Sequence, residues 1–296
     1  MNSVKKPSIL FIMPYYGKWP DWFPAFLLSC KLNPDIDWLI PTDCMIPDDS
    51  PSNVKFVEST LEKLRTTTSK VTGLNVIMDR AYKTCDIRPA FAHIFSEEVK
   101  NYDFWGHCDM DIIFGKIRNF MTVDLLNKYD IITTRKERIA GHFTLYRNRD
   151  DINCLYKKHS DYEMVFTSEG NYHYDENRMT EVIKSELKSG ADLKVYWPNF
   201  LLNYRVPRDK PSIVPKSLNK WRWSNGKLYD EGKDGGEIMY FHFMTWKKTL
   251  KYCLFNYDDN PPEFYISYTH VSIKKSPLPA KFMSIDISKI FPRLFS

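Results

Sequence analysis

The sequence predicts an α/β fold in which helices flank a central sheet, followed by an irregular and basic C-terminal extension. Residues 8–13 form a short, continuous apolar run typical of a buried parallel strand; a helical pattern at 23–32 and a second apolar run at 36–40 follow. A further helical stripe leads into an apolar run that ends at Asp109. From residue 203 onward the pattern becomes irregular and rich in proline and basic residues. This order of elements places a ligand crevice beyond the carboxyl ends of the strands.

The remaining elements follow in order along the chain. A helix is expected to begin at Arg88, because Pro89 is tolerated in the first turn of a helix. Residues 112–115, directly after the acids, are expected to form a brief turn. Further strands are expected at residues 53–57, 130–134, 141–146 and 193–197, and further helices at 60–68 and 175–187. Residues 74–77 are expected to form a weak strand or a turn-flanked piece.

Composition places the chain among soluble globular proteins, with 43% hydrophobic and 27% charged residues. The net charge of +5 is uneven, because residues 203–296 carry 16 Lys and Arg against 9 Asp and Glu. This excess favours an anionic surface or ligand, and a merely solvated basic face is the alternative. The last segment, SPLPAKFMSIDISKIFPRLFS, is expected to be an amphipathic surface helix or a packed tail. Nucleic acid is not an expected partner, since the basic residues form no stripe interleaved with aromatics.

The cysteine spacing indicates a reducing compartment, and the hydropathy argues against a secretory signal and a membrane-spanning helix. The six cysteines are scattered, with no C-x-x-C spacing, which argues against a zinc site or a disulfide scaffold. The N-terminal apolar run is stopped by Pro14 and is shorter than a secretory h-region, and no run reaches the length of a membrane-spanning helix. We therefore expect a cytoplasmic protein, with peripheral contact to the anionic inner face of the plasma membrane left open.

Two acids one residue apart are the strongest chemical signal in the sequence. In the stretch WGHCDMDIIFG, Asp109 and Asp111 lie between two apolar runs. An ionised carboxylate is costly to bury unless a cation meets it, so the pair is either solvated or holds an ion. On an extended segment both side chains point to the same side, where they can share one hard cation such as Mg²⁺ or Mn²⁺. The pair therefore predicts a metal–diphosphate site.

The order of these motifs resembles a known family. The chain resembles glycosyltransferases of the GT-A fold, which is Rossmann-related and has a mixed central sheet. The resemblance lies in the order of an N-terminal βαβ half, the segment K-x-x-D-x-R-P (Lys83, Asp86, Arg88, Pro89), a helix and an apolar-D-x-D run. The likeness is strongest to uncharacterised bacterial glycosyltransferase-like proteins of surface-polysaccharide gene clusters. It implies a GT-A-like catalytic domain over residues 1–250 and a C-terminal extension over 251–296 that associates with a membrane or a partner.

The resemblance implies a divalent metal, Mn²⁺ or Mg²⁺, held by Asp109 and Asp111 against the diphosphate of a nucleotide-sugar donor, with UDP-sugars the first expectation. Several members add a histidine near the end of the fold, and His242 in EIMYFHFMTWKK is the candidate. The segment resembles the His-then-Lys-Pro-Trp region of glycogenin-type retaining enzymes, although the glycine and the Lys-Pro order are missing. Lys247 is then a candidate phosphate ligand. A core histidine in an aromatic strand is the alternative.

The loop after the first strand is expected to bind the nucleobase and ribose. A ring of Tyr15 or Tyr16 can stack on a pyrimidine, and Gly17 lets the backbone approach closely. Asp43, at the end of the second strand, is a candidate hydrogen-bond acceptor for ribose or uracil. An ordinary strand-to-helix turn is the alternative.

The three polar residues before the acids are expected to serve the donor. Arg88 offers a fork for phosphate or for sugar hydroxyls, and Asp86 accepts from sugar hydroxyls or orients Arg88. Lys83 belongs to the same cluster. The alternative is a helix N-terminus with Asp86 as its cap.

Three later residues are catalytic candidates. His142 is expected over the donor sugar, and Asp175 or Glu176 is the candidate base that deprotonates the acceptor hydroxyl in an inverting enzyme. Acids at a helix N-terminus are also common for dipole reasons alone. The likeness at His242 favours retention of configuration and the acid pair favours inversion, so the stereochemistry stays open.

The function implied is a metal-dependent glycosyltransferase of hexosyltransferase type, acting on a surface-polysaccharide or lipid-linked glycan acceptor. A nucleotidyltransferase acting on sugar phosphates also uses paired acids and Mg²⁺, but PYYGKWP lacks the glycine-rich phosphate loop of that class. A non-catalytic glycan-binding module, in which the D-x-D acids form a solvated turn, is the third alternative.

Overall fold

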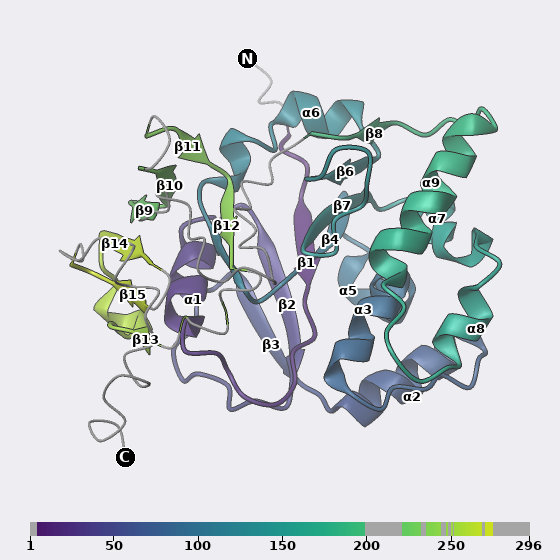
Figure 1. Ribbon diagram of the computed structural model, residues 1–296, viewed down its shortest axis with the longest axis horizontal. Coiled ribbons are helices and arrows are strands. Elements are labelled where there is room, and N and C mark those ends of the chain that lie inside the picture. The colour runs from purple at the N-terminus through teal and green to yellow at the C-terminus, as the bar shows by residue number, and fades with distance from the viewer. Residues whose placement is uncertain are drawn as a thin grey trace, which may run out of the picture. The chain divides into compact units, whose positions relative to one another are not determined.

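The computed structural model describes residues 5–198, 221–231, 235–243, 247, 250, 252–267 and 270–274 (Figure 1). The chain divides into two compact units, each built from separate stretches of sequence. The first unit comprises Met1–Lys18, Pro34–Met110 and Met121–Leu201; the second comprises Trp19–Asn33, Asp111–Phe120 and Leu202–Ser296. The predicted boundary at residue 250 stays a prediction.

The first unit is built on a seven-stranded mixed sheet, which confirms the predicted α/β class. Parallel pairing joins β3 to β2, β2 to β1, β1 to β4 and β6 to β8, whereas β7 lies antiparallel between β4 and β6. In sheet order the strands are β3 (Val54–Glu58), β2 (Asp37–Thr42), β1 (Ile9–Ile12), β4 (Phe104–Cys108), β7 (Phe143–Arg147), β6 (Ile131–Thr133) and β8 (Val195–Tyr196).

The central strand β1 is buried along its whole length, as its apolar run predicts. Its side chains alternate between the two faces of the sheet. Leu10 and Ile12 belong to the large apolar cluster formed with the helices of this unit. Phe11 faces the other way, with its ring centroid 5.9 Å from Trp38 and 5.1 Å from Phe143. A one-residue slip of register would exchange these two sets, so both faces fix the strand in place.

The helices of the first unit other than α6 contribute side chains to the apolar cluster on the sheet face that carries Leu10 and Ile12. Thr60 caps α2 by accepting the N–H of Lys63, and Gly73 ends it with φ of 74°. The bounds are α2 (Leu61–Thr72), α3 (Thr84–Ile87), α4 (Phe91–Ile94), α5 (Ser96–Val99), α6 (Val123–Lys128), α7 (Asp150–Asn153), α8 (Tyr162–Phe166) and α9 (Met179–Lys188). Figure 1 shows α2, α3, α8 and α9 gathered together beside the sheet.

Two predicted elements of the first unit differ from the structure. Of the two alternatives for 74–77, the strand is wrong: the backbone there is a loop, in which the N–H of Ile77 donates to the carbonyl of Phe166. The helix predicted from Arg88 is a series of short pieces, since a 3₁₀ turn at Arg88–Ala90 separates α3 from α4. Pro89 lacks an N–H and therefore cannot continue the bonding of α3.

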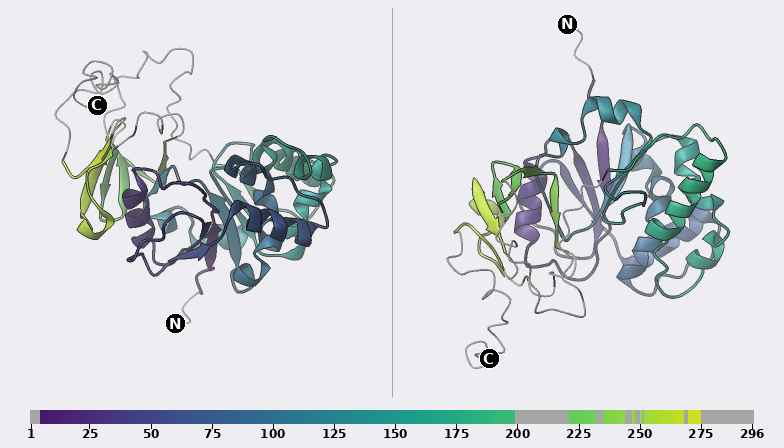
Figure 2. Two further views of the ribbon diagram at one scale, coloured as in Figure 1. Left: turned by 90° about the horizontal axis from the view of Figure 1, so that it is seen from below. Right: turned by 45° about the horizontal axis from the view of Figure 1, so that its top comes forward.

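The second unit contains α1 (Phe23–Lys31), a two-stranded ribbon and a six-stranded sheet. The ribbon pairs β5 (Ile112–Phe114) with β12 (Tyr240–His242) in antiparallel fashion. The sheet, drawn in green and yellow in Figure 2, has the order β11 (Glu237–Ile238), β10 (Lys227–Asp230), β9 (Trp221–Ser224), β14 (Glu263–Ile266), β15 (His270–Ser272) and β13 (Tyr252–Cys253). The prediction of irregular structure is therefore wrong for these segments, and the prediction of a brief turn at 112–115 is wrong for β5.

Side chains from distant parts of the second unit hold β5 in place. The indole N–H of Trp223 donates to the carbonyl of Phe114 at 3.0 Å, and the Asn33 amide donates to the carbonyl of Gly115 at 2.8 Å. Phe26 of α1 packs against Phe114, with ring centroids 6.2 Å apart. Because Asp111 directly precedes β5, these contacts also fix the backbone beside this acid.

All six cysteines are free thiols, in agreement with the spacing argument against a disulfide scaffold. No helix within the described parts of the chain is long and apolar enough to cross a membrane. The predicted amphipathic segment at residues 276–296 lies outside the described residues.

Candidate functional site

The two acids of the D-x-D motif follow β4 directly, as the sequence predicts. The N–H of Asp109 donates to the carbonyl of His142 at 3.2 Å, which continues the pairing of β4 with β7 by one residue. The carbonyl of Asp111 accepts the N–H of Phe243 at 2.9 Å, next to the β5–β12 ribbon. Strand pairing on both sides therefore holds this short segment.

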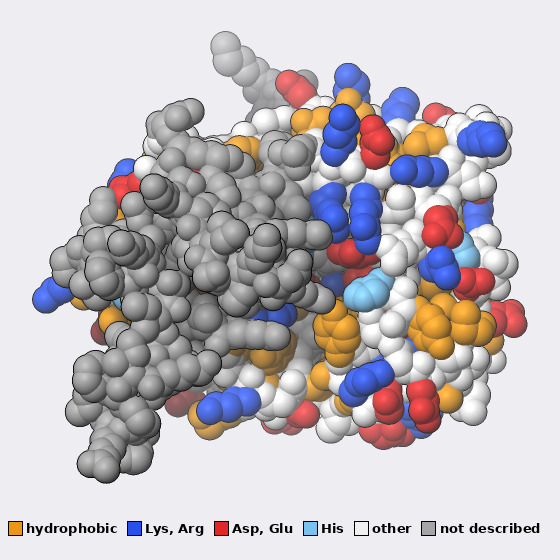
Figure 3. Space-filling view, in the orientation of Figure 1, with side chains coloured by type: hydrophobic (Ala, Val, Ile, Leu, Met, Phe, Trp, Pro, Cys, Tyr) orange, Lys and Arg blue, Asp and Glu red, His pale blue; other side chains and the backbone are white. Residues whose placement is uncertain are grey.

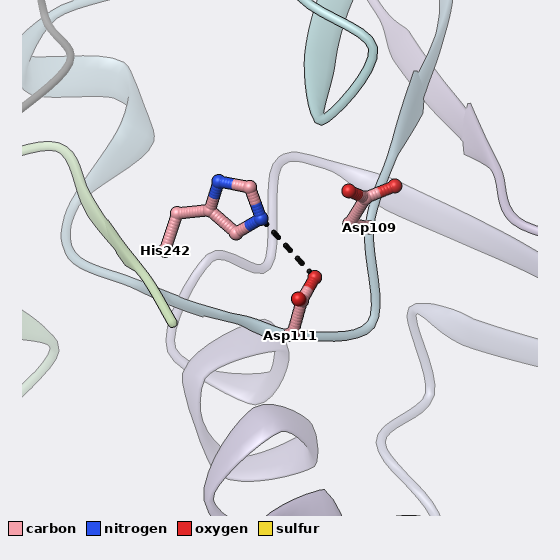
Figure 4. A group of neighbouring side chains, drawn as sticks. All are labelled: Asp109, Asp111 and His242. Atoms are coloured by element: carbon pink, nitrogen blue, oxygen red, sulfur yellow. Dashed lines mark ion pairs between the residues drawn. The ribbon is translucent and has the colours of Figure 1, made fainter. Parts of the chain in front are cut away.

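Asp111 is a buried carboxylate in contact with two nitrogen groups. Its side chain is only 7% exposed; Oδ1 lies 3.2 Å from Nε2 of His242, and Oδ2 lies 3.0 Å from Nζ of Lys247. The β5–β12 register, which pairs Ile112 with His242, brings the imidazole to the acid (Figure 4). Burial alone would raise the pKa of Asp111, but the charges of His242 and Lys247 hold it well below its usual range.

Asp109 has a different partner. Nη2 of Arg88 donates to Oδ1 of Asp109 at 2.5 Å, and Nη1 donates to the Gly141 carbonyl at 2.8 Å and to Oδ2 of Asp175 at 3.0 Å. The guanidinium is 14% exposed and Asp109 is 26% exposed. Arg88 thus links the first acid of the motif to the catalytic candidate Asp175, although these two acids lie far apart in the sequence.

Asp175 is almost completely buried, with a side chain 3% exposed. Burial raises its pKa to about 7, although the charge of Arg88 acts in the opposite direction. Its Oδ1 is buried and makes no hydrogen bond within the described part of the chain. A carboxyl group that titrates near neutral pH is suited to general acid–base chemistry.

Its neighbour Glu176 is held by three contacts. Oε1 accepts the N–H of Gly141 at 3.0 Å, while Oε2 lies 3.2 Å from Arg138 and 3.6 Å from Arg135. A Cβ on Gly141 would lie 2.7 Å from Oδ2 of Asp175 and 3.1 Å from Cγ of Glu176. Gly141 is therefore required by close packing against both acids.

His107 belongs to this group, and the sequence prediction did not include it. Its Nδ1 lies 2.8 Å from the carbonyl of Gly141, the same oxygen that accepts from Arg88. Burial lowers the pKa of His107 to about 3, so the ring is neutral and its Nδ1–H is the donor in this contact. The signal was the two-residue period of β4, which places His107 and Asp109 on the same side.

Lys83 and Asp86 form a buried ion pair, and both side chains are 0% exposed. The ammonium donates to Asp86 at 3.0 Å and to the carbonyl of Val165 at 2.7 Å. Asp86 also accepts the backbone N–H groups of Tyr172 and Tyr174 at 2.9–3.1 Å. These contacts engage both side chains with partners inside the protein, and Asp86 makes no helix-cap bond. The pair instead fixes the backbone that leads into Asp175.

The loop after β1 is ordered by Asp43. Its Oδ1 accepts the N–H of Gly17 at 2.7 Å, and Gly17 has φ of 107° with open space where a Cβ would lie. The N–H of Tyr15 bonds to the Pro41 carbonyl, and its hydroxyl donates to the carbonyl of Lys18 at 3.1 Å. Tyr16 packs against the apolar cluster, and burial raises its pKa to about 12. The structure thus leaves Tyr15 as the better of the two candidates for stacking.

His142 is 5% exposed, and its Nε2 lies 3.4 Å from the hydroxyl of Thr134. Its backbone carbonyl accepts the N–H of Asp109.

Asp109, Asp111 and His242 are the candidate metal group, each offering one ligand atom (Figure 4). Two carboxylate oxygens and an imidazole nitrogen suit Mn²⁺, and the carboxylates also suit Mg²⁺. The cationic groups of Arg88 and Lys247 lie against the two acids, which shows that both carboxylates accommodate positive charge. The residues present therefore fit a divalent cation.

Comparison with solved structures gives matches of low identity. The galactosyltransferase LgtC, in complex with donor and acceptor sugar analogues, matches with 11% identity over 58% of this chain and 69% of its own, with a TM-score of 0.32. The glycosyltransferase GlyE of Streptococcus pneumoniae TIGR4 matches with 10% identity over 65% of this chain and 45% of its own, with a TM-score of 0.33. Mouse xyloside xylosyltransferase 1 matches with 8% identity over 63% and 85%, also with a TM-score of 0.33.

No curated protein matches the sequence. A family model does match, that of a family of unknown function designated DUF6625, and it covers residues 11–274. Since this match spans most of the sequence, the chain belongs to the DUF6625 family.

Proposed function

We propose that this protein is a metal-dependent glycosyltransferase that moves a sugar from a nucleotide-diphosphate sugar, in the first place a UDP-sugar, to a glycan acceptor. The observation that carries the proposal is the buried carboxylate of Asp111, which contacts both His242 and Lys247 and lies one residue from Asp109. A structural ion pair would need only one of these partners. An acid with an imidazole and an ammonium beside it provides both a metal ligand set and a phosphate-binding cation.

The metal would be held by Asp109, Asp111 and His242, and when bound it would neutralise the negative charge that develops on the diphosphate leaving group. Lys247 would help to neutralise the same charge, because its side chain is 52% exposed and its ammonium can reach a bound phosphate. Arg88 is the second cation, held on Asp109 and Asp175. Both were expected as donor ligands from the sequence.

The transfer step forms a bond between the acceptor hydroxyl oxygen and the anomeric carbon, and it breaks the bond between that carbon and the diphosphate oxygen. A base must accept the proton of the acceptor hydroxyl. Asp175 is the better candidate for that base, since burial raises its pKa to about 7 and its Oδ1 makes no hydrogen bond among the described residues. Glu176 is engaged by Gly141, Arg135 and Arg138, and we assign it to holding the 135–141 loop.

The remaining expectations concern binding. Tyr15 and Gly17 are proposed to contact the nucleobase and ribose, with Asp43 holding the loop through the Gly17 N–H. The basic excess of residues 203–296 supports an anionic acceptor, such as a lipid-linked glycan of surface-polysaccharide synthesis, reached at the inner membrane face. If so, deleting residues 274–296 should release the protein from vesicles containing anionic lipid, and unchanged binding would refute the membrane proposal.

The function is tested by the release of nucleoside diphosphate from a panel of UDP- and GDP-sugars in the presence of Mn²⁺. We expect one donor to be turned over slowly onto water, and the turnover to be lost on chelation and in Asp111→Asn. Asp258→Asn, an exposed acid of the same unit, is the control and should behave like the wild type. Release of pyrophosphate from a nucleoside triphosphate and a sugar phosphate, with no turnover of nucleotide sugars, would favour a nucleotidyltransferase instead.

A further inference from the structure

Both acids of the D-x-D motif are neutralised by cations of the protein itself. Arg88 lies against Asp109, and Lys247 lies 3.0 Å from Oδ2 of Asp111. A divalent cation that binds these acids must therefore compete with side chains that are already present. The two internal cations differ in how firmly they are held.

Arg88 is fixed. Its guanidinium is 14% exposed and donates to three different oxygens, those of Asp109, Asp175 and the Gly141 carbonyl. If Arg88 left this position, the buried carboxylate of Asp175 would lose its cation, which is strongly unfavourable. Arg88 therefore remains in place whatever binds at Asp109.

Lys247 is displaceable. Its side chain is 52% exposed, so moving the ammonium fully into water costs little free energy. Asp111, in contrast, is only 7% exposed and needs a positive partner at all times. The geometry thus provides a buried carboxylate that must be neutralised and a neutralising group that is half-exposed to water.

We propose that Lys247 is a built-in substitute for the metal ion at Asp111. Without metal, its ammonium neutralises the buried carboxylate. When a divalent cation binds, the repulsion between two positive charges at one carboxylate expels the ammonium into solvent. The expelled ammonium is then available to the diphosphate of the donor.

The proposal rests on the proposed function and adds regulation to it. Competition by Lys247 weakens metal binding in the absence of nucleotide. A nucleotide diphosphate that captures the ammonium removes this competition, so it strengthens metal binding beyond what direct contact gives. By linkage, metal and nucleotide each tighten the binding of the other. The protein would therefore retain metal mainly when the donor is present.

The experiment is a Mn²⁺ titration of the full chain without nucleotide, in which free Mn²⁺ is measured by electron paramagnetic resonance. Lys247→Met removes the competitor, and we expect its dissociation constant for Mn²⁺ to fall by about two- to fivefold, as for the loss of a half-exposed ion pair. Lys247→Arg keeps a cation at this position and should bind Mn²⁺ like the wild type. Lys227→Met is the matched control: this lysine is 47% exposed, pairs with Glu237 in the same unit, and should leave the constant unchanged.

Repeating the titration with saturating UDP tests the second half of the proposal. UDP should lower the Mn²⁺ dissociation constant by a larger factor in the wild type than in Lys247→Met. Equal Mn²⁺ binding by the wild type and Lys247→Met without UDP, or weaker binding by the variant, would overturn the proposal while leaving the metal-dependent function intact. Failure of the wild type to bind Mn²⁺ under any condition would overturn both.

Discussion

The buried pair of Lys83 and Asp86 gives the sharpest prediction about stability. In Lys83→Met the apolar part of the side chain is retained and only the ammonium is lost. Lys83 is 0% exposed, so its removal leaves Asp86 as a buried carboxylate without its cation, and it leaves the carbonyl of Val165 without this donor. Removing one partner of a buried pair costs about 3–5 kcal/mol of unfolding free energy. The midpoint of thermal unfolding should fall by roughly 5–8 °C.

The assay is urea denaturation followed by far-ultraviolet circular dichroism. Lys100→Met is the matched control, because Lys100 and Glu97 are also a lysine–acid pair three residues apart, but with side chains 58% and 81% exposed. This control should unfold like the wild type. A loss below about 1 kcal/mol in Lys83→Met would refute the reasoning, since it would mean that Asp86 does not depend on the ammonium.

Two further predictions concern the surroundings of Asp175. In Gly141→Ala the added Cβ would lie 2.7 Å from Oδ2 of Asp175, so we expect the unfolding free energy in urea denaturation to fall by about 1–3 kcal/mol and nucleotide-sugar turnover to be lost. In the control Gly236→Ala the added Cβ meets open space. An effect of Gly141→Ala no larger than that of the control would contradict the packing argument. Because burial raises the pKa of Asp175 from 3.8 to about 7, the native chain binds a proton that the unfolded chain releases, and the unfolding free energy should fall by up to about 4 kcal/mol as the pH rises from 4 to 7. Asp175→Asn should lack this component, and identical pH dependence of stability in both proteins would show that Asp175 does not titrate in this range.

The D-x-D motif could be predicted from the sequence because its information is local. Asp109 and Asp111 lie between apolar runs, and a strand followed by paired acids has few interpretations. His242 could be proposed only through the resemblance to glycogenin-type enzymes, and its contact with Asp111 depends on the pairing of β5 with β12. That pairing joins segments more than a hundred residues apart and has no local signal.

The role of Lys83 and Asp86 could not be predicted for a similar reason. The sequence places them beside Arg88, and all three were expected to face the donor. Their partners, the carbonyl of Val165 and the N–H groups of Tyr172 and Tyr174, come from a distant segment that closes over them. Burial by long-range contacts therefore separates these two residues from Arg88.

The hairpin of β9 and β10 in the second unit, by contrast, could have been predicted from local sequence. Trp221 and Trp223 are buried, the residues that alternate with them are half-buried, and Asn225-Gly226 follows with φ of 48° and 82°. Asn-Gly between alternating residues is the strongest short-range indication of a hairpin. The proline-rich and basic composition around it outweighed this pattern in the prediction of irregular structure.

The central claim is that WGHCDMDIIFG binds an ion for a nucleotide diphosphate. Calorimetric titration of UDP, and of GDP beside it, into the wild type and Asp111→Asn, with and without Mn²⁺, tests this most directly. The account predicts binding of one nucleotide that requires Mn²⁺ and disappears in the variant. Absence of binding by either nucleotide with any metal, or metal-independent binding that Asp111→Asn retains, would contradict it.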